Sequence, residues 1–129
     1  MKGHLLDTNI ILIAQTKPEA LSRAARGAIT HGPVIVSAVS YWEVLLKSQK
    51  GNLDVGDPRA WWPETLDQLA ATPLPIYPRH LDVLIPLPPI HKDPFDRLLI
   101  AQAISEDLDL VTTDDVIRRY AKAGCRVVL

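Results

Sequence analysis

Short apolar segments alternate with longer amphipathic segments along this chain. Runs of apolar and β-branched residues predict strands at residues 4–6, 34–37, 74–77, 108–112 and 126–129. Helical patterns lie between them, at residues 10–14, 19–31, 39–50, 58–71, 79–85, 94–106 and 115–123. Alternation of this kind indicates an α/β fold with a parallel sheet.

The composition excludes only a few classes of protein. At 129 residues the chain is predicted to form one domain, and its 47% hydrophobic and 22% charged residues are ordinary for a globular protein. The single cysteine, Cys125, cannot form an internal disulfide, and no apolar run approaches the roughly 18 residues of a membrane span. We therefore expect a cytoplasmic protein with no membrane partner. A net charge of −1 does not by itself indicate nucleic-acid binding.

Four acidic residues are placed where strands end or helices begin: Asp7, Glu43, Asp96 and Asp114. Asp7 and Asp114 follow the first and fourth predicted strands. Glu43 is expected in the first turn of the helix after the second strand, and Asp96 in the first turn of the helix before the fourth. Because the carboxyl ends of parallel strands meet at one edge of a sheet, and ligands bind beyond that edge, we expect these acids to lie together.

Each acid also has a purely structural explanation. Asp7 and Asp114 could cap the helices that follow them. Glu43 could close a capping box with Ser40, or pair with Lys47 one turn later.

The segment around Pro94 assigns different roles to two aspartates. Asp93 precedes Pro94, which favours the first helical position, so Asp93 is the expected N-cap. Asp96 then falls on the apolar arc of the helix that should face the sheet. The opposite side carries Gln102, Ser105 and Glu106. An inward-facing acid at a helix start suggests a shared cation.

Four carboxylates at one edge repel one another strongly. Some of them would have to be protonated unless a counter-charge were present. Oxygen ligands of this kind suit Mg²⁺ or Mn²⁺, and such sites favour attack of water on a phosphodiester. The histidines do not have the spacing of a transition-metal site; they are His4, His31, His80 and His91. The chain has no glycine-rich phosphate loop.

Four segments resemble the motifs of the PIN-domain ribonucleases, in particular the VapC-type toxins of toxin–antitoxin pairs. They are LLDTN at residues 5–9, SAVSYWE at 37–43, residues 91–103 and residues 110–114, and the DPFDR block at 93–97 is the most specific. The resemblance covers essentially the whole chain and implies a single PIN domain over residues 1–129, with helices on both sides of a parallel sheet in the order 3-2-1-4-5. It further implies Mg²⁺- or Mn²⁺-dependent cleavage of RNA, inhibition by a VapB-type antitoxin, and a homodimer.

The resemblance also implies roles for individual residues. It makes Asp7, Glu43, Asp96 and Asp114 the catalytic, metal-binding acids. Thr8 and Asn9 are expected to hold the turn after Asp7, and Thr112 to be a polar residue near the cleft. A basic rim could come from Lys47, Lys50, Arg97, Arg118, Arg119 and Lys122. Lys47 and Arg97 are the candidates for contact with RNA, although solvated helix faces explain each of these charges as well.

Two adjacent tryptophans point to a partner surface. Neighbouring helical residues point about 100° apart, so one of Trp61 and Trp62 should be partly exposed. Core packing explains most of these side chains as well. Together with Trp42, the two residues mark the helices over which an apolar and basic antitoxin segment is expected to bind.

The alternative functions are a metal-dependent phosphatase, a DNA nuclease, and a non-catalytic PIN-like binding protein. Asn9 stands where a haloacid-dehalogenase-like phosphatase would carry a second acid.

Overall fold

Five parallel strands form the centre of the computed structural model, which describes residues 3–129. The strands are β1 (His4–Leu6), β2 (Val34–Ser37), β3 (Thr72–Leu74), β4 (Asp109–Val111) and β5 (Arg126–Val128). Their order across the sheet is β3-β2-β1-β4-β5, and all four pairings are parallel. The predicted strand order is confirmed. The central strand β1 pairs with β2 on one side and β4 on the other, so the order reverses beside it.

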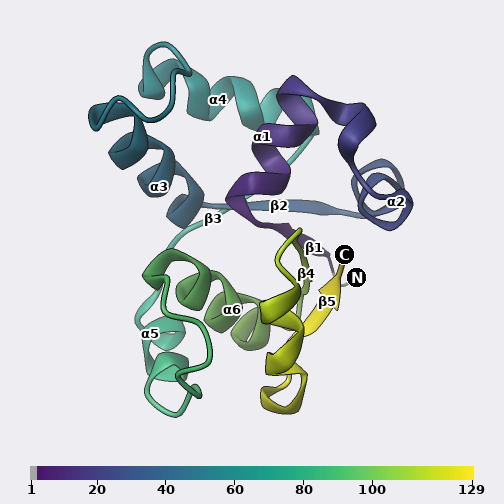
Figure 1. The fold of residues 1–129 in the computed structure, drawn as a ribbon, viewed down its shortest axis with the longest axis vertical. Helices are drawn as coiled ribbons and strands as arrows, with labels where there is room; N and C mark the ends of the chain where they lie inside the picture. The colour runs from purple at the N-terminus through teal and green to yellow at the C-terminus, as the bar shows by residue number, and fades with distance from the viewer. Residues whose placement is uncertain (1–2) are drawn as a thin grey trace.

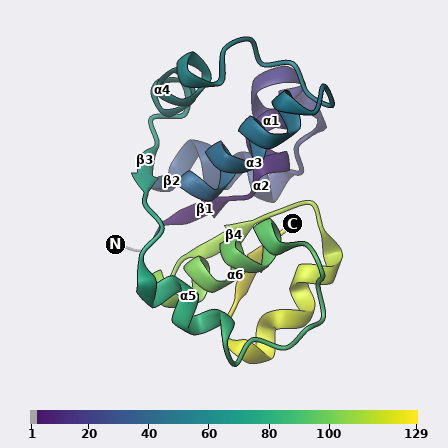
Figure 2. The same ribbon diagram turned by 90° about the vertical axis from the view of Figure 1, so that its left-hand side faces the viewer.

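Helices cover both faces of this sheet, which gives the predicted three layers (Figures 1 and 2). One face carries α1 (Thr8–Thr16), α2 (Arg23–His31), α3 (Ala38–Gln49) and α4 (Pro58–Leu69). The other carries α5 (Pro78–Leu84), α6 (Pro94–Glu106) and the 3₁₀ helix η2 (Asp115–Ala123). Within residues 3–129, no helix combines the length and the apolar character that crossing a membrane requires.

Two apolar cores lie on opposite faces of the sheet. Leu5 and Leu110 pack into the core beneath α6, whereas their neighbours Leu6 and Val111 pack into the core beneath α1. Successive side chains of a strand point to opposite faces, so a sheet covered on both sides needs continuous apolar runs. This explains why the strands were recognisable in the sequence.

The third strand begins two residues earlier than predicted and ends at Leu74 rather than at residue 77. The prediction began it after Pro73, at residue 74, but Pro73 itself pairs with Val36. Proline lacks a backbone N–H and is tolerated in an edge strand, which needs hydrogen bonds on one side only. Because β3 is an edge strand, Pro73 does not end it.

The helix predicted over residues 19–31 is two elements. A short 3₁₀ turn, η1 (Pro18–Ala20), precedes α2, which begins after Ser22. The Ser22 hydroxyl accepts a hydrogen bond from the Ala25 N–H at 3.0 Å, which is an N-cap that starts a new helix. The last predicted helix has the predicted bounds but 3₁₀ rather than α geometry.

Candidate metal centre

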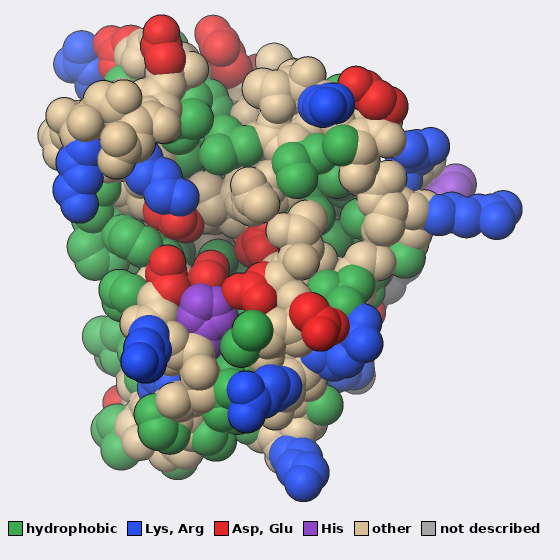
Figure 3. Space-filling view, viewed as in Figure 1, with side chains coloured by type: hydrophobic (Ala, Val, Ile, Leu, Met, Phe, Trp, Pro, Cys, Tyr) green, Lys and Arg blue, Asp and Glu red, His purple; other side chains and the backbone are tan. Residues whose placement is uncertain are grey.

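All four predicted acids line one cavity at the carboxyl ends of β1 and β4. This cavity, the acidic pocket, has a volume of about 280 Å³. Its lining residues are Asp7, Thr8, Asn9, Leu12, Glu43, Lys47, Asp93, Asp96, Thr113 and Asp114. Figure 3 shows acidic side chains gathered around a hollow on this face, with a histidine beside them.

Asp7 is both a helix cap and a wall of the acidic pocket. It is buried, and its Oδ1 accepts a hydrogen bond from the Ile10 N–H at 2.8 Å, which caps α1. Its Oδ2 accepts a hydrogen bond from the Thr112 hydroxyl. Burial raises the pKa of Asp7 above its ordinary value, and the charges of Glu43 and Asp114 raise it further, against the effect of these hydrogen bonds. Asp7 therefore caps α1 and lines the acidic pocket at the same time.

The predicted supporting residues join the elements around Asp7. The Thr8 hydroxyl donates to the Ser40 hydroxyl at 2.9 Å, which ties α1 to α3. The Asn9 amide donates to the Thr113 hydroxyl at 3.2 Å. Thr112 connects two acids, because its hydroxyl donates to Asp7 and accepts from the Asp114 N–H at 3.0 Å. These hydrogen bonds connect the start of α1 to α3 and to the segment that follows β4.

Glu43 lies in the second turn of α3, not in its first turn as predicted. The helix begins at Ala38 and is capped by Ser37, whose hydroxyl accepts from the Val39 N–H at 3.0 Å. This earlier start excludes the capping box with Ser40, and the alternative pair with Lys47 is present at 3.0 Å. The second carboxylate oxygen of Glu43, Oε1, is buried and has no hydrogen-bond partner among the described residues. A buried unpaired carboxylate oxygen is costly, so this atom suits a bound cation.

Asp93 is the N-cap of α6 as predicted, and it lines the acidic pocket together with Asp96. Asp93 caps α6, because its Oδ1 accepts from the N–H groups of Phe95 at 2.8 Å and Asp96 at 3.2 Å. Asp96 faces the acidic pocket from the first turn of α6. Burial, and then the neighbouring charge of Asp93, raise the pKa of Asp96 to about 7, although His91 opposes this rise.

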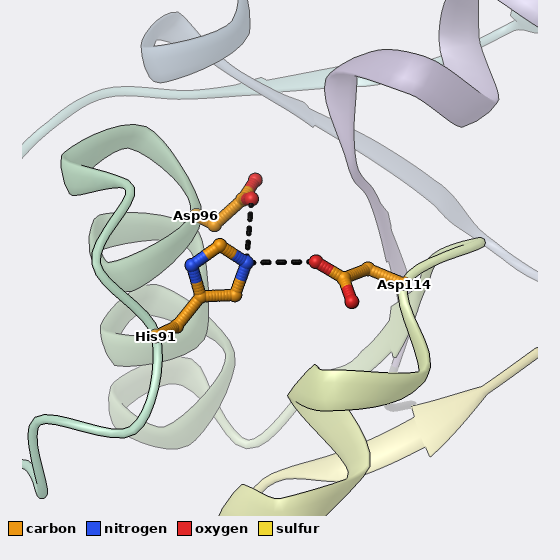
Figure 4. A group of neighbouring side chains, drawn as sticks. All are labelled: His91, Asp96 and Asp114. Carbon is orange, nitrogen blue, oxygen red and sulfur yellow. Dashed lines mark hydrogen bonds and ion pairs between the residues drawn. The ribbon is translucent and has the colours of Figure 1, made fainter.

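His91 is the site residue that the sequence analysis missed. Its Nε2 lies 2.7 Å from Asp114 Oδ2 and 3.1 Å from Asp96 Oδ2, and Figure 4 marks both contacts with dashed lines. The other oxygen of Asp114 accepts from the Val116 N–H at 2.9 Å and caps η2. The three side chains place their ligand atoms within 4.8 Å of one another. The available signal was the position of His91 two residues before the DPFDR block.

The predicted RNA-binding cations occupy different places. Lys47 lines the acidic pocket beside Glu43. Arg97 does not line it, and its guanidinium donates to the backbone carbonyls of Leu87, Pro88 and His91. Contact of Arg97 with RNA stays a prediction. In the structure this side chain forms hydrogen bonds to the loop that precedes α6. The other rim candidates, Lys50, Arg118, Arg119 and Lys122, also lie outside the lining of the pocket.

The tryptophans differ in burial as expected. Trp61 is buried, and its indole N–H donates to Gln15 at 3.1 Å. Trp62 is half-buried and stacks on Tyr41 with ring centroids 5.0 Å apart. Trp42 is 48% exposed and meets the Phe95 ring edge-on. One member of the adjacent pair is therefore partly exposed, as predicted.

Comparison with known proteins identifies the fold family. Residues 4–123 match the family model described as the PIN domain. The chain belongs to the PIN-domain family. It is 30% identical over 118 residues to Ribonuclease VapC22 of Mycobacterium tuberculosis, covering 90% of each chain. This confirms the resemblance to VapC proteins on which the residue roles were based.

Solved structures agree with this PIN-domain assignment. The fold matches a chain of the DNA-bound VapBC complex of Salmonella typhimurium with a TM-score of 0.70 and 18% identity, over 99% of this chain and 98% of that one. It matches a chain of VapBC2 of Rickettsia felis, bound to a promoter DNA fragment, with a TM-score of 0.67 and 14% identity, over 97% and 96%. At these identities the match concerns the fold alone.

Proposed function

We propose that this PIN domain is a Mg²⁺- or Mn²⁺-dependent endoribonuclease and the toxin of a type II toxin–antitoxin pair. The observation that carries the proposal is the convergence of Asp7, Glu43, Asp96 and Asp114 on one pocket, where the buried Glu43 Oε1 atom has no hydrogen-bond partner within residues 3–129. Carboxylate oxygens without sulfur ligands suit Mg²⁺ and Mn²⁺. The similarity to a protein named as a ribonuclease favours RNA as the substrate.

In this proposal the side chains of the pocket have separate tasks. Asp7, Glu43, Asp96 and Asp114 hold the cation, which when bound supplies an activated water and stabilises the leaving oxygen. Thr112 keeps the Asp7 carboxylate directed into the pocket through their hydrogen bond. Lys47 offers a positive charge at the pocket wall, where a backbone phosphate of RNA could pair with it.

We propose a VapB-type antitoxin as the partner and a homodimer as the assembly. The solved relatives are toxin–antitoxin complexes, which favours such a partner for this chain. The exposed Trp42 beside Phe95, and the half-buried Trp62 on Tyr41, are the apolar surfaces that we assign to it. We also propose that residues 1–129 act as one domain in the cytoplasm, where a lone thiol such as Cys125 stays reduced.

The test is cleavage of labelled RNA by matched Asp→Asn variants. With Mn²⁺ present, Asp96→Asn should lose about 100-fold or more in rate, because even partners of metal ligands cost 10- to 100-fold when changed. Asp93→Asn should keep much of the wild-type rate although it removes one negative charge from the lining of the pocket, since Asn is an equally good N-cap. EDTA should abolish cleavage by the wild type and by Asp93→Asn.

Each contrary result identifies a different error. Equal loss in the two folded variants would refute the separation of cap and ligand. Cleavage of DNA or of a phosphomonoester in place of RNA would favour the nuclease or phosphatase alternatives. Absence of any cleavage with intact metal binding would favour a binding protein.

A further inference from the structure

The loop that carries His91 is fixed by two side chains from other elements. The buried Tyr120 hydroxyl accepts from the His91 N–H at 2.7 Å and donates to the Pro88 carbonyl at 2.8 Å. Arg97 donates to the carbonyls of Pro88 at 3.0 Å and His91 at 3.4 Å. The imidazole therefore extends from a backbone whose position is set, and Figure 4 shows it pointing toward Asp96 and Asp114, two of the acids that line the acidic pocket.

The hydrogen bonds of the ring determine which nitrogen carries the proton. The Asp93 backbone N–H points at His91 Nδ1, at 3.1 Å. A backbone N–H can only donate, so Nδ1 accepts with its lone pair. In a neutral imidazole the proton is then on Nε2. The Nε2–H is therefore a donor directed at Asp114 Oδ2 and Asp96 Oδ2.

This arrangement is the reverse of a metal-bound histidine. A ligating histidine offers a bare nitrogen to the metal and donates its other N–H to an acceptor. For Nε2 to ligate, the proton of His91 would have to move to Nδ1, where it would face the Asp93 N–H. Two opposed N–H groups would lose the hydrogen bond that holds the ring.

His91 also occupies the oxygens that a cation needs. Asp114 Oδ1 caps η2, so Oδ2 is the oxygen left for a ligand, and His91 holds it. We propose that His91 is a positioning residue that holds Asp96 and Asp114 by hydrogen bonds and competes with the divalent cation for their oxygens, rather than ligating it. This inference rests on the metal site proposed above. It predicts that metal binding must displace the His91 N–H from one or both carboxylates.

Two substitutions test the acceptor Nδ1 and the donor Nε2 of His91 separately. In His91→Asn the side-chain oxygen is as many bonds from the backbone as Nδ1, and asparagine commonly accepts the N–H two residues on. This variant keeps the bond from Asp93 and removes the donor to the carboxylates. His91→Gln does the opposite, since its longer amide reaches the carboxylates as a donor. His31→Asn, at an exposed position, is the matched control.

The measurement is Mn²⁺ binding by calorimetry to proteins first treated with EDTA. His91→Asn should bind Mn²⁺ about tenfold more tightly than the wild type, because the ion no longer has to break a hydrogen bond to a charged group. His91→Gln and His31→Asn should stay within about threefold, because each keeps a donor at the carboxylates. Weaker binding, or unchanged binding, by His91→Asn would overturn the competition.

A second measurement does not depend on any variant. Long-range ¹H–¹⁵N spectra of the EDTA-treated wild type should show His91 with its proton on Nε2, and added Mg²⁺ should shift the ring signals without removing that proton. A proton on Nδ1 in either state would refute the inference. Unchanged Mn²⁺ affinity in His91→Asn would refute the competition alone, whereas failure of every protein to bind Mn²⁺ would refute the proposed metal site with it.

Discussion

The two ends of helix α6 hold carboxylates in opposite electrostatic conditions. Glu106, its last residue, accepts two hydrogen bonds from Arg79, at 2.8 and 3.1 Å, and one from His80 at 3.0 Å. We call Arg79, His80, Gln102 and Glu106 the α5–α6 clasp. The Arg79 side chain lowers the pKa of Glu106 to about 2, whereas burial and Asp93 raise the pKa of Asp96 at the other end to about 7.

The helix dipole alone predicts the reverse. It stabilises an anion near the N-terminus of a helix and destabilises one near the C-terminus, by about 0.3–1 kcal/mol. Asp96 lies at the N-terminal end and Glu106 at the C-terminal end. The local partners therefore outweigh the dipole at both positions.

The difference separates a carboxylate whose charge is balanced within the protein from a group of carboxylates whose charges are not. In the clasp, one carboxylate meets a guanidinium and an imidazole, so its charge is neutralised within the protein. In the acidic pocket, five carboxylates have Lys47 as the one Lys or Arg among the lining residues that the structure describes. Groups with strongly perturbed pKa values in a cavity indicate a functional site. The lining of the pocket therefore keeps an excess of negative charge, as the metal site proposed above requires.

The largest effect that tests this comparison is stabilisation by a divalent cation. At a Mn²⁺ concentration 100 times its Kd, binding to the native state adds about 2.7 kcal/mol, or about 10 °C in Tm for a chain of this size. Asp7→Asn should lose most of this shift, because Asp7 lines the pocket. Glu106→Gln should keep all of it. Thermal melts with Mn²⁺ or EDTA measure both, and equal shifts in wild type and Asp7→Asn would exclude Asp7 from the site.

A smaller effect tests the charge balance without metal. In EDTA at pH 7.5, Asp96→Asn should raise the free energy of unfolding by about 1 kcal/mol, allowing for the partial exposure of this carboxyl. Glu106→Gln should lower the free energy of unfolding by about 1–2 kcal/mol, because it removes the charge that Arg79 binds. Urea titrations of both variants supply the measurement. Changes of the same sign would show that the two ends of α6 do not differ.

The pH profiles of these variants should also differ. The folded pKa of Asp96, about 7, lies above its ordinary value of 3.8. The destabilisation of the folded state by ionised Asp96 is therefore absent below about pH 4 and grows as the pH rises to 7. Asp96→Asn should accordingly be as stable as the wild type at pH 4. The folded pKa of Glu106, about 2, lies below its ordinary value of 4.5. The stabilisation of the folded state by ionised Glu106 is present above pH 4.5 and is lost as the pH falls toward 2. Glu106→Gln should therefore still be less stable than the wild type at pH 4.

Much of the fold and the acid positions could be predicted from one sequence, because periodicity reports which face of an element is apolar. Asp7, Asp96 and Asp114 were placed correctly, since each lies within two or three residues of a strand end or helix cap. Periodicity does not report what covers a polar face. Gln102 was predicted on the side of α6 away from the sheet, yet it is fully buried, because α5 packs there and Gln102 donates to the Pro75 carbonyl at 3.2 Å.

His91 escaped prediction for a related reason. It lies in a loop, where no period applies, and it meets Asp114 across 23 residues of sequence. Ligand spacing rules find groups that share one element. They cannot find a histidine brought to a site by the hydrogen bonds of Tyr120 and Arg97 to its loop.

The smallest predicted effect concerns Lys47, whose positive charge partly balances the carboxylates of the acidic pocket. Its ammonium binds Glu43 at 3.0 Å, so Lys47→Gln removes a phosphate partner and also leaves Glu43 without a counter-charge. RNA binding, measured by fluorescence anisotropy in an Asp96→Asn background, should weaken about threefold, and its salt slope should fall by about 0.7. Mn²⁺ binding to the protein with Asp96 intact should strengthen about twofold to threefold, because one competing positive charge is gone. Lys50→Gln, one turn on and exposed, should change neither quantity. Weakening of both ligands by Lys47→Gln would mean that Lys47 supports the shape of the pocket rather than its charge.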